Sequence, residues 1–202
     1  MKLIGSTTSP YVRKVRILLE EKGLAYEFVA EQPWEPTTHV PDYNPLGKVP
    51  ALVADDGRIW FDSTVVAEYI ETLGAAPAFL PADPLARVEV RQLAVLADGI
   101  VDAGVAWRVD AQRPEERQDA KWIARQRGKA ERGLDKLEQL ATGQEWLHRS
   151  GYGLADVAAV CALGFLDFRH PSLDWRASRP QLTAYAERIV RRPAFAATIP
   201  FA

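Results

Sequence analysis

The stretch that decides how this chain folds reads Asn44-Pro45-Leu46-Gly47-Lys48-Val49-Pro50-Ala51-Leu52-Val53. Its asparagine, prolines and glycine are turn residues, and its last three residues form an apolar run too short for a helix. A proline at the mouth of a strand gives the sheet no amide donor, so Pro50 is expected at an edge or at the first strand position. If the Val49–Pro50 bond is cis, the N–H and C=O of Val49 point outward, and an extended peptide can pair there as an extra strand.

The residues before this stretch predict a strand, a helix, a second strand and a loop. The strand 2–5 leads into a polar loop, after which Pro10 suits the first turn of a helix capped by Ser9 or Thr8. That helix ends at Gly23, and its polar face is expected to comprise Arg13, Lys14 and Arg16. A strand over 25–29 follows, and the prolines within 34–48 predict an irregular loop with at most one helical turn.

The residues after it predict a strand over 51–54, a strand over 58–60 and a helix over 63–73. The element order is then β-α-β-loop-β-β-α, in which the first two strands can be parallel and the last two form an antiparallel hairpin. A group of prolines after residue 76 predicts an interdomain linker. We therefore predict a first domain over 1–76, a linker over 77–84 and a second domain over 85–202.

The second domain is predicted to be entirely helical. The expected helices span 85–110, 114–141, 154–168 and 180–191. Pro114 with the two acidic residues after it suits a helix N-terminus. The helix 154–168 is apolar on all sides, which is typical of the central helix of a bundle, and Cys161 within it is interpreted as a core residue.

The composition is that of a globular protein in a reducing compartment. The chain has 202 residues, 48% of them hydrophobic and 26% charged, with one cysteine and a net charge of −2. These values predict no disulfide framework and give no reason to expect nucleic acid as a partner. The first residues lack the apolar core of a signal peptide and no stretch is long enough to span a membrane, so we expect a cytoplasmic protein.

Three local sequence features are candidates for binding or catalysis. Ser9 stands at a helix start, where a hydroxyl and backbone amides favour a negative charge, although a capping role alone would explain it. Asp62-Ser63 opens the next helix, either as a cap or as a holder of an ammonium and a carboxylate. Lys48 is either a solvated loop charge or a contact for a second carboxylate. No histidine or lysine adjoins Ser9, so a serine nucleophile with a general base is unsupported.

These residues together resemble a known family. The chain is similar to the cytosolic glutathione S-transferase superfamily in four segments: Ser9-Pro10-Tyr11 to Arg16, Glu21-Lys22-Gly23, Asn44 to Leu52, and Asp62-Ser63 to Ile70. Leu154-Ala155-Asp156 also resembles the capping box of the family, with Gly153 where serine or threonine is usual. The resemblance implies an α/β thioredoxin-like N-terminal domain and an all-α helical-bundle C-terminal domain.

The resemblance also implies roles for individual residues. Ser9, or Thr8 in its place, would donate a hydrogen bond to the glutathione sulfur, as in the serine-type classes. Val49, beside a cis Pro50, would pair with the cysteinyl backbone. The γ-glutamyl end would be bound by Asp62, which replaces the more usual Glu or Gln, and by Ser63. Lys48 or Trp34 would contact the glycyl carboxylate.

The expected reaction is conjugation of glutathione, as co-substrate, to a small hydrophobic electrophile, without metal or other cofactor. Its pocket is expected between the domains, with Trp34, Trp107 and Arg108 in its walls, although Trp107 also suits a core or a dimer interface. The resemblance implies a homodimer. The alternatives are a non-catalytic protein-binding relative and a specialised glutathione-dependent isomerase, dehalogenase or peroxidase.

Overall fold

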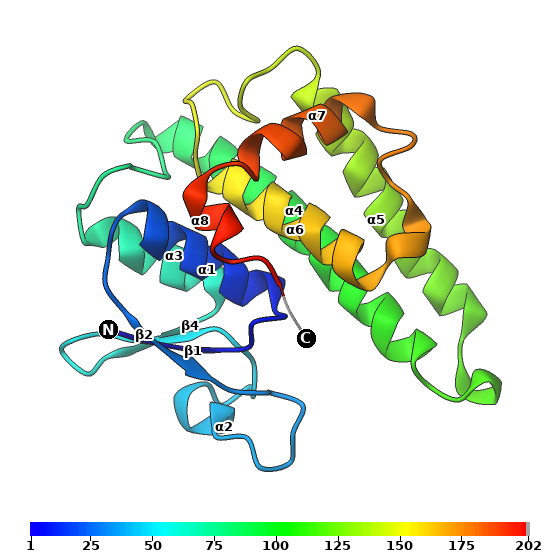
Figure 1. The fold of residues 1–202 in the computed structure, drawn as a ribbon, viewed down its shortest axis with the longest axis horizontal. Helices are drawn as coiled ribbons and strands as arrows, with labels where there is room; N and C mark the ends of the chain where they lie inside the picture. Colours follow the sequence, from blue (N-terminus) through cyan, green and yellow to red (C-terminus); the bar gives the residue numbers. More distant parts are fainter. Residues whose placement is uncertain (201–202) are drawn as a thin grey trace. The chain divides into compact units, whose positions relative to one another are not determined.

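The computed structural model describes residues 1–200, which divide into two compact units (Figure 1). Unit 1 comprises residues 1–79 together with the described residues from Arg192 onward, and unit 2 comprises Leu80–Arg191. The boundary after Phe79 falls inside the segment 77–84 that the sequence predicts as a linker. No helix within residues 1–200 combines the length and the apolar character needed to span a membrane.

Unit 1 is built on a four-stranded sheet with the strand order β2-β1-β3-β4. The strands are β1 (Lys2–Gly5), β2 (Glu27–Ala30), β3 (Ala51–Val53) and β4 (Ile59–Phe61). The pair β1/β2 is parallel, whereas β1/β3 and β3/β4 are antiparallel. The predicted crossover and hairpin are therefore confirmed, although β2 begins and ends slightly later than the sequence pattern indicates.

The register of this sheet gathers three chain segments at one edge. Ile4 near the end of β1 pairs with Ala51 at the start of β3, and Ala51 pairs with Phe61 at the end of β4. Adjacent strands lie about 4.8 Å apart, so the residues that follow β1, precede β3 and follow β4 are neighbours. These segments are the loop that ends at Ser9, the dipeptide Val49-Pro50, and Asp62-Ser63.

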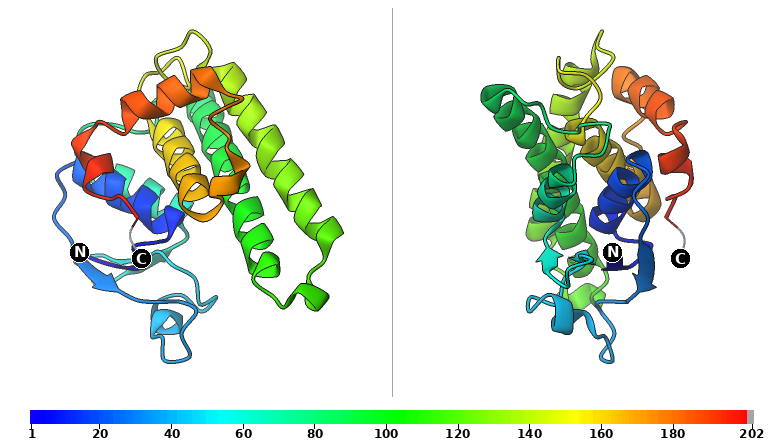
Figure 2. Two further views of the ribbon diagram at one scale, coloured as in Figure 1. Left: turned by 45° about the vertical axis from the view of Figure 1, so that its right-hand side comes forward. Right: turned by 90° about the vertical axis from the view of Figure 1, so that its left-hand side faces the viewer.

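Helices cover both faces of the sheet (Figures 1 and 2). They are α1 (Pro10–Glu21) and α3 (Ser63–Thr72) on one face and the short α2 (Val40–Tyr43) on the other. Alternate residues of a strand point to opposite faces. Ile4 and Ala51 therefore pack against Val40 of α2, while Leu3 and Leu52, which are also fully buried, lie on the side of α1 and α3.

The described residues from Arg192 onward return to unit 1, which corrects the predicted second domain over 85–202. They contain the short helix α8 (Pro193–Ala196), which contacts α1. The Arg192 guanidinium forms an ion pair with Glu21 at 2.6 Å, and Arg13 donates to the carbonyl of Phe195 at 3.3 Å. Local sequence patterns could not predict this contact, because the partners lie more than 170 residues apart in the chain.

The same segment covers the basic residues of α1, which the sequence predicts as the polar face of this helix. Arg13 and Lys14 are only 5% and 2% exposed, and Arg16 donates to the carbonyl of Ala197 at 3.3 Å. Their charges therefore belong to the interior and the rim of unit 1, where the C-terminal segment covers α1.

Unit 2 is a bundle of long helices. Its elements are α4 (Pro84–Ala111), α5 (Ala120–Ala141), α6 (Leu154–Arg169) and α7 (Pro180–Ile189), with 3₁₀ turns at Glu115–Arg117 and Pro171–Leu173. Most residues of α6, including Cys161, are buried, as predicted for a central helix.

One helix start differs from the prediction. The helix expected from Pro114 begins instead at Ala120, because Asp119 caps it by accepting from the amides of Lys121 and Trp122 at 3.0 Å. The residues after Pro114 form only a single 3₁₀ turn. A capping carboxylate with two amide partners is the stronger start signal here than a proline followed by acidic residues.

The carboxylate of Asp156 ties the start of α6 to its surroundings. It accepts hydrogen bonds from the Gly153 amide at 2.8 Å, the Leu147 amide at 2.9 Å and the Tyr185 hydroxyl at 2.5 Å. The side chain is fully buried, and burial raises its pKa while these hydrogen bonds lower it. As the sequence predicts, Asp156 supports the helix start although Gly153 has no side chain to cap it.

We expect Asp156→Ala to lower the free energy of unfolding by about 3 kcal/mol or more, because three buried donors lose their partner and each costs roughly 1–3 kcal/mol. Chemical denaturation measures the change. The control is Glu131→Ala, which removes an exposed pair with Arg127 on α5 and should cost about 1 kcal/mol or less. Equal, small losses in the two variants would contradict the role of Asp156.

Candidate functional site

Ser9 caps α1 through its side-chain oxygen, which acts as a hydrogen-bond acceptor. Its Oγ accepts from the Val12 amide at 3.3 Å, and its backbone is extended immediately before Pro10. A hydroxyl can accept and donate at once, and within residues 1–200 no acceptor for the Ser9 proton is found, so a ligand can accept it. The neighbouring candidate Thr8 differs, since its hydroxyl shares a hydrogen bond with that of Ser6 at 3.1 Å.

Val49 offers an open backbone edge. The Val49–Pro50 peptide bond is cis, as the tight turn suggested. The last pair in the β1/β3 register is Ile4 with Ala51, so Val49 lies beyond the paired part of the sheet. Within residues 1–200 its N–H and C=O form no hydrogen bond. An extended ligand would find both groups available.

The side chain of Asn44 holds the loop that carries Lys48 and Val49. Its Oδ1 accepts from the Leu46 amide at 3.0 Å and its Nδ2 donates to the Lys48 carbonyl at 2.8 Å. Asn44 is buried, whereas the side chain of Lys48 is exposed. The sequence marked Asn44 only as a turn residue, although asparagine at such a position commonly bonds to the backbone two residues later.

Asp62 and Ser63 begin α3 in an unusual backbone conformation. The Asp62 carboxylate accepts from the Thr64 amide at 2.8 Å, so the capping interpretation is confirmed. Its φ of 69° with ψ of 127° lies in a region that non-glycine residues rarely adopt, at a cost of about 1–3 kcal/mol. Such strain is concentrated at functional sites. Ser63 is buried, and its hydroxyl has no hydrogen-bond partner among the described residues.

Two helix N-termini therefore meet at one edge of the sheet, those of α1 and α3. Helix N-termini favour anions, because their amides and dipoles present partial positive charge. Between them lies the free backbone of Val49, with the exposed charges of Asp62 and Lys48 on either side of it in the sequence. This combination suits a short peptide that carries carboxylates, an amine and one further anionic group.

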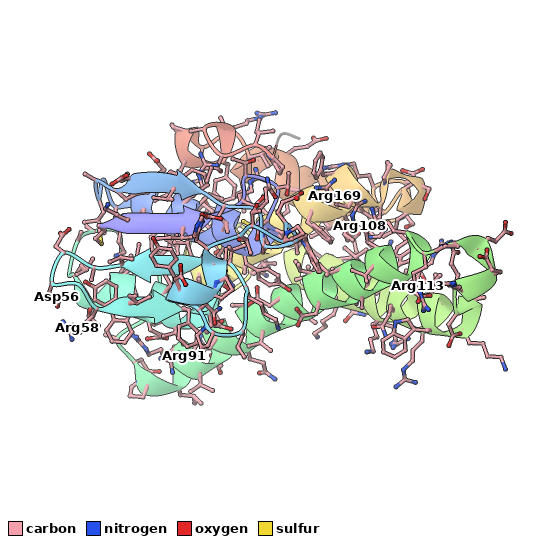
Figure 3. The ribbon with its side chains drawn as sticks, turned by 90° about the horizontal axis from the view of Figure 1, so that it is seen from below. Asp56, Arg58, Arg91, Arg108, Arg113 and Arg169 are labelled. Carbon is pink, nitrogen blue, oxygen red and sulfur yellow. The ribbon has the colours of Figure 1, made fainter. Side chains whose placement is uncertain are left out.

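The predicted electrophile wall has members in both units. Trp34 in unit 1 is 78% exposed, and no ring contact of its side chain is found within the described residues. Trp107 and Arg108 lie near the C-terminal end of α4 in unit 2 (Figure 3 labels Arg108). The Trp107 ring stacks on that of His170, with 3.9 Å between their centroids. A pocket that joins these residues stays a prediction.

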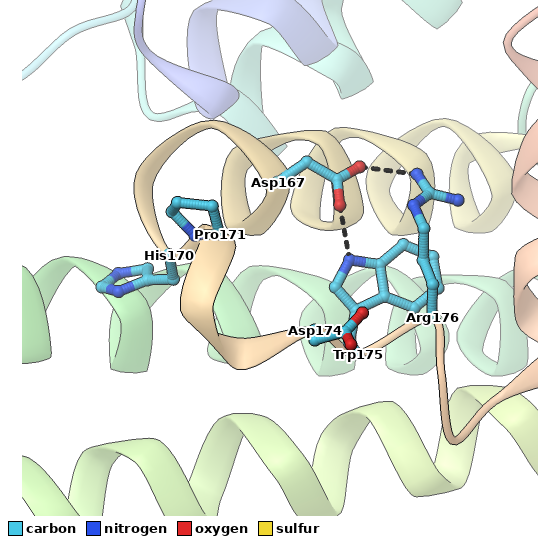
Figure 4. Close-up of a pocket in the computed structure, with 6 residues that line it drawn as sticks. All are labelled: Asp167, His170, Pro171, Asp174, Trp175 and Arg176. Carbon is cyan, nitrogen blue, oxygen red and sulfur yellow. Dashed lines mark hydrogen bonds and ion pairs between the residues drawn. The ribbon is translucent and has the colours of Figure 1, made fainter.

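A small pocket in unit 2 lies where α6 ends (Figure 4). Polar side chains that line this pocket form hydrogen bonds with one another. Asp167 accepts from the Trp175 ring nitrogen at 2.8 Å and from Arg176 at 2.6 Å. The sequence did not mark these residues, and their hydrogen bonds explain them as supports for the turn after α6.

Comparison with known proteins connects this arrangement to a family. The family model of the glutathione S-transferase N-terminal domain matches residues 8–73, and that of the C-terminal domain matches residues 120–188. The chain is 46% identical over 201 residues to the uncharacterized GST-like protein YibF of Escherichia coli K12, covering 99% of this chain and 98% of that one. The chain belongs to the glutathione S-transferase family.

Two solved structures extend the comparison to the fold of this transferase family member. A glutathione S-transferase from Methylobacterium radiotolerans, in complex with glutathione sulfonate, has a TM-score of 0.95 and 42% identity, over 100% of this chain and 95% of that one. A family member from Pseudomonas fluorescens Pf-5 with bound S-(propanoic acid)-glutathione has a TM-score of 0.88 and 40% identity, over 100% of both chains. Unit 1 therefore has the thioredoxin-like fold and unit 2 the helical fold of glutathione transferases.

We expect Asp62→Gly to retain more of the protein's free energy of unfolding than Asp62→Ala does. Glycine tolerates positive φ and is a fair N-cap, whereas alanine loses the cap and keeps the strained backbone, so the two should differ by about 1–2 kcal/mol. Paired denaturation curves measure the difference. An alanine variant as stable as the glycine variant would show that the backbone of Asp62 carries no strain.

Proposed function

We propose that the protein is an enzyme that binds glutathione and activates its thiol toward an electrophilic second substrate. The observation that carries the proposal is the strand register, which aligns Ser9, Val49 and Asp62-Ser63 at one edge of the sheet. A module that only binds proteins has no need to keep a free hydroxyl, a free backbone edge and a strained cap together.

Each part of the tripeptide has a partner in this proposal. The cysteinyl backbone pairs with Val49, and the Ser9 hydroxyl donates to the sulfur. Asp62 binds the ammonium of the γ-glutamyl group, while Ser63 and the start of α3 bind its carboxylate. Lys48, or Trp34 in its place, contacts the glycyl carboxylate. The unpaired donors and acceptors described above support these assignments.

The energetic demand on Ser9 is modest. A free thiol has a pKa near 8.5, so roughly 3% of it is thiolate at pH 7. Lowering that pKa by about two units requires about 2.7 kcal/mol. A hydrogen bond to an anion contributes roughly 1.5–3 kcal/mol and a helix N-terminus roughly 0.3–1 kcal/mol. Ser9 at the start of α1 is therefore sufficient, and the proposal needs no general base.

Of the two solved relatives, the one from Pseudomonas fluorescens Pf-5 supports conjugation as the reaction. One binds glutathione sulfonate and the other binds a glutathione whose sulfur carries a propanoic acid group, as a conjugation product would. Isomerisation, dehalogenation and peroxide reduction would begin from the same thiolate. The choice among these reactions depends on the second substrate.

We also propose a cytoplasmic homodimer, as is typical of the family. The exposed apolar residues Leu85, Val88 and Val95 follow one side of α4 at helical spacing and support an interface with a second copy. Sedimentation at micromolar concentration should give twice the mass of the chain, and a monomer there would contradict the dimer.

We expect Ser9→Ala to lower kcat/KM by about 10- to 100-fold, because the variant loses one hydrogen bond to the thiolate. The assay offers glutathione with a panel of aryl halides, isothiocyanates, halogenated acids and peroxides. The loss of the cap should also lower the free energy of unfolding by about 1 kcal/mol, which denaturation measures separately.

Thr8→Ala is the matched control and should keep its activity, because the Thr8 hydroxyl is already bonded to Ser6. Full activity in Ser9→Ala with loss in Thr8→Ala would assign the thiolate contact to Thr8. Glutathione binding by the wild type without turnover of any member of the panel would favour the non-catalytic alternative.

A further inference from the structure

The loop that leads from β1 to Ser9 contains a chain of side-chain hydrogen bonds that ends at Gln32. The Ser6 hydroxyl donates to the side-chain carbonyl oxygen of Gln32, Oε1, at 3.2 Å. The same hydroxyl shares a hydrogen bond with that of Thr8, with 3.1 Å between the two oxygens, and accepts from the Thr8 amide at 3.4 Å. All of these residues belong to unit 1. The network therefore holds the loop immediately before Ser9.

The backbone of the sheet brings Gln32 to this loop. In the parallel pair of β1 and β2, Gly5 lies beside Ala30, and the Glu31 amide donates to the Gly5 carbonyl at 2.9 Å. The next residues along the two chain segments are Ser6 and Gln32. Two segments that are already joined by backbone hydrogen bonds thus present the hydroxyl and the side-chain amide to each other.

The single proton of the Ser6 hydroxyl fixes the direction of the network. A hydroxyl offers one donor and two acceptor positions. Because Ser6 donates to Gln32, its bond with Thr8 must be donated by the Thr8 hydroxyl. The two acceptor positions of Ser6 are then filled by the hydroxyl and the amide of Thr8. The hydroxyl proton of Thr8 is therefore directed into the loop.

The burial of Ser6 preserves this direction. Ser6 is only 3% exposed, so water competes weakly for its proton. Within residues 1–200, the other oxygen that bonds to the Ser6 hydroxyl is that of Thr8. If the side chain at position 32 stopped accepting, the Ser6 proton would turn to Thr8, and the Thr8 proton would be released.

The network lies at the open edge of the sheet. The last pair in the antiparallel register of β1 and β3 is Ile4 with Ala51. Continued by two residues, this register leads to Ser6 on one side and Val49 on the other. The backbone of Val49 is the proposed contact of the cysteinyl residue of glutathione. A Thr8 proton released from Ser6 would therefore lie near the cysteinyl sulfur.

Ser9 and Thr8 thus differ in the fate of their protons. The Ser9 oxygen accepts from the Val12 amide, and within residues 1–200 no acceptor for the Ser9 proton is found. The Thr8 proton, in contrast, is used by Ser6. Of these two adjacent hydroxyls, only that of Ser9 can donate to a bound anion without breaking a hydrogen bond of the loop.

We propose that Gln32 is a positioning residue for the glutathione thiolate: through Ser6 it directs the Thr8 proton into the loop, so that Ser9 alone donates to the sulfur. The proposal rests on the proposed glutathione-activating function. It makes the acceptor character of the side chain at position 32 the deciding property. A carboxylate there would keep the direction of the network because it only accepts, whereas an ammonium would reverse it because it only donates.

The test measures the apparent pKa of the thiol of bound glutathione from the ultraviolet absorbance of its thiolate. Thr8→Val, which removes the hydroxyl and keeps the shape, is made in wild type, Gln32→Glu and Gln32→Lys. In wild type and Gln32→Glu it should change this pKa by less than about 0.2, because Thr8 does not donate to the sulfur. In Gln32→Lys it should raise the pKa by about 0.5 or more, because a released Thr8 hydroxyl donates to the thiolate and favours the charged form.

Gln32→Glu is the matched control for Gln32→Lys. Each effect of Thr8→Val is measured within one background, so the charge introduced at position 32 cancels from the comparison. Gln32→Leu, which offers neither donor nor acceptor, should behave like Gln32→Lys, because the Ser6 proton then has only Thr8 to bond. Thermal denaturation checks that every variant is folded. A loop that was merely loosened would not make the pKa depend on Thr8.

Two results would overturn the role of Gln32 and leave the proposed function intact. One is an equal effect of Thr8→Val in the Gln32→Glu and Gln32→Lys backgrounds, and the other is no effect in either Gln32→Lys or Gln32→Leu. Wild-type protein that binds no glutathione, or whose bound glutathione ionises only near pH 8.5, would instead contradict the proposed function itself.

Discussion

The pairing of Ile4 with Ala51, and of Ala51 with Phe61, is the constraint on which the candidate site depends. A slip of one residue in either pair would turn the buried side chains of β3 to the opposite face and displace Val49 from the two helix starts. Ala51 and Leu52 are fully buried on opposite faces, so packing on both sides fixes the register. The chemistry at the edge is therefore set by the core of unit 1.

The predicted parts of the site that the strand register brings together, Ser9, Val49-Pro50 and Asp62-Ser63, lie at element boundaries. Caps and turns have local signals, so Ser9, Val49-Pro50 and Asp62-Ser63 could be marked from their neighbours in the chain. The hydrogen bonds of the Asn44 side chain and the positive φ of Asp62 were not predicted. Both depend on the three-dimensional path of the backbone, before β3 for Asn44 and after β4 for Asp62. Local sequence patterns thus identify residues of the site but not the hydrogen bonds and backbone conformations that position them.

The errors in the fold have a different origin. The sequence identifies Arg13 only as part of the polar face of α1, because nothing near it in the sequence indicates that residues around Phe195 will cover it. The close packing of α4 against α6 is similarly invisible in the sequence, because it depends on the missing side chain of Gly104, where a Cβ would meet Phe165. Contacts between distant segments require the folded structure.

The central claim is that this chain ionises a thiol with one serine at a helix start. The most direct measurement is the ultraviolet absorbance of the thiolate of bound glutathione as the pH is varied. The account predicts an apparent thiol pKa of roughly 6.5 in the complex, about two units below that of a free thiol. A bound glutathione that ionises only near pH 8.5 would contradict it.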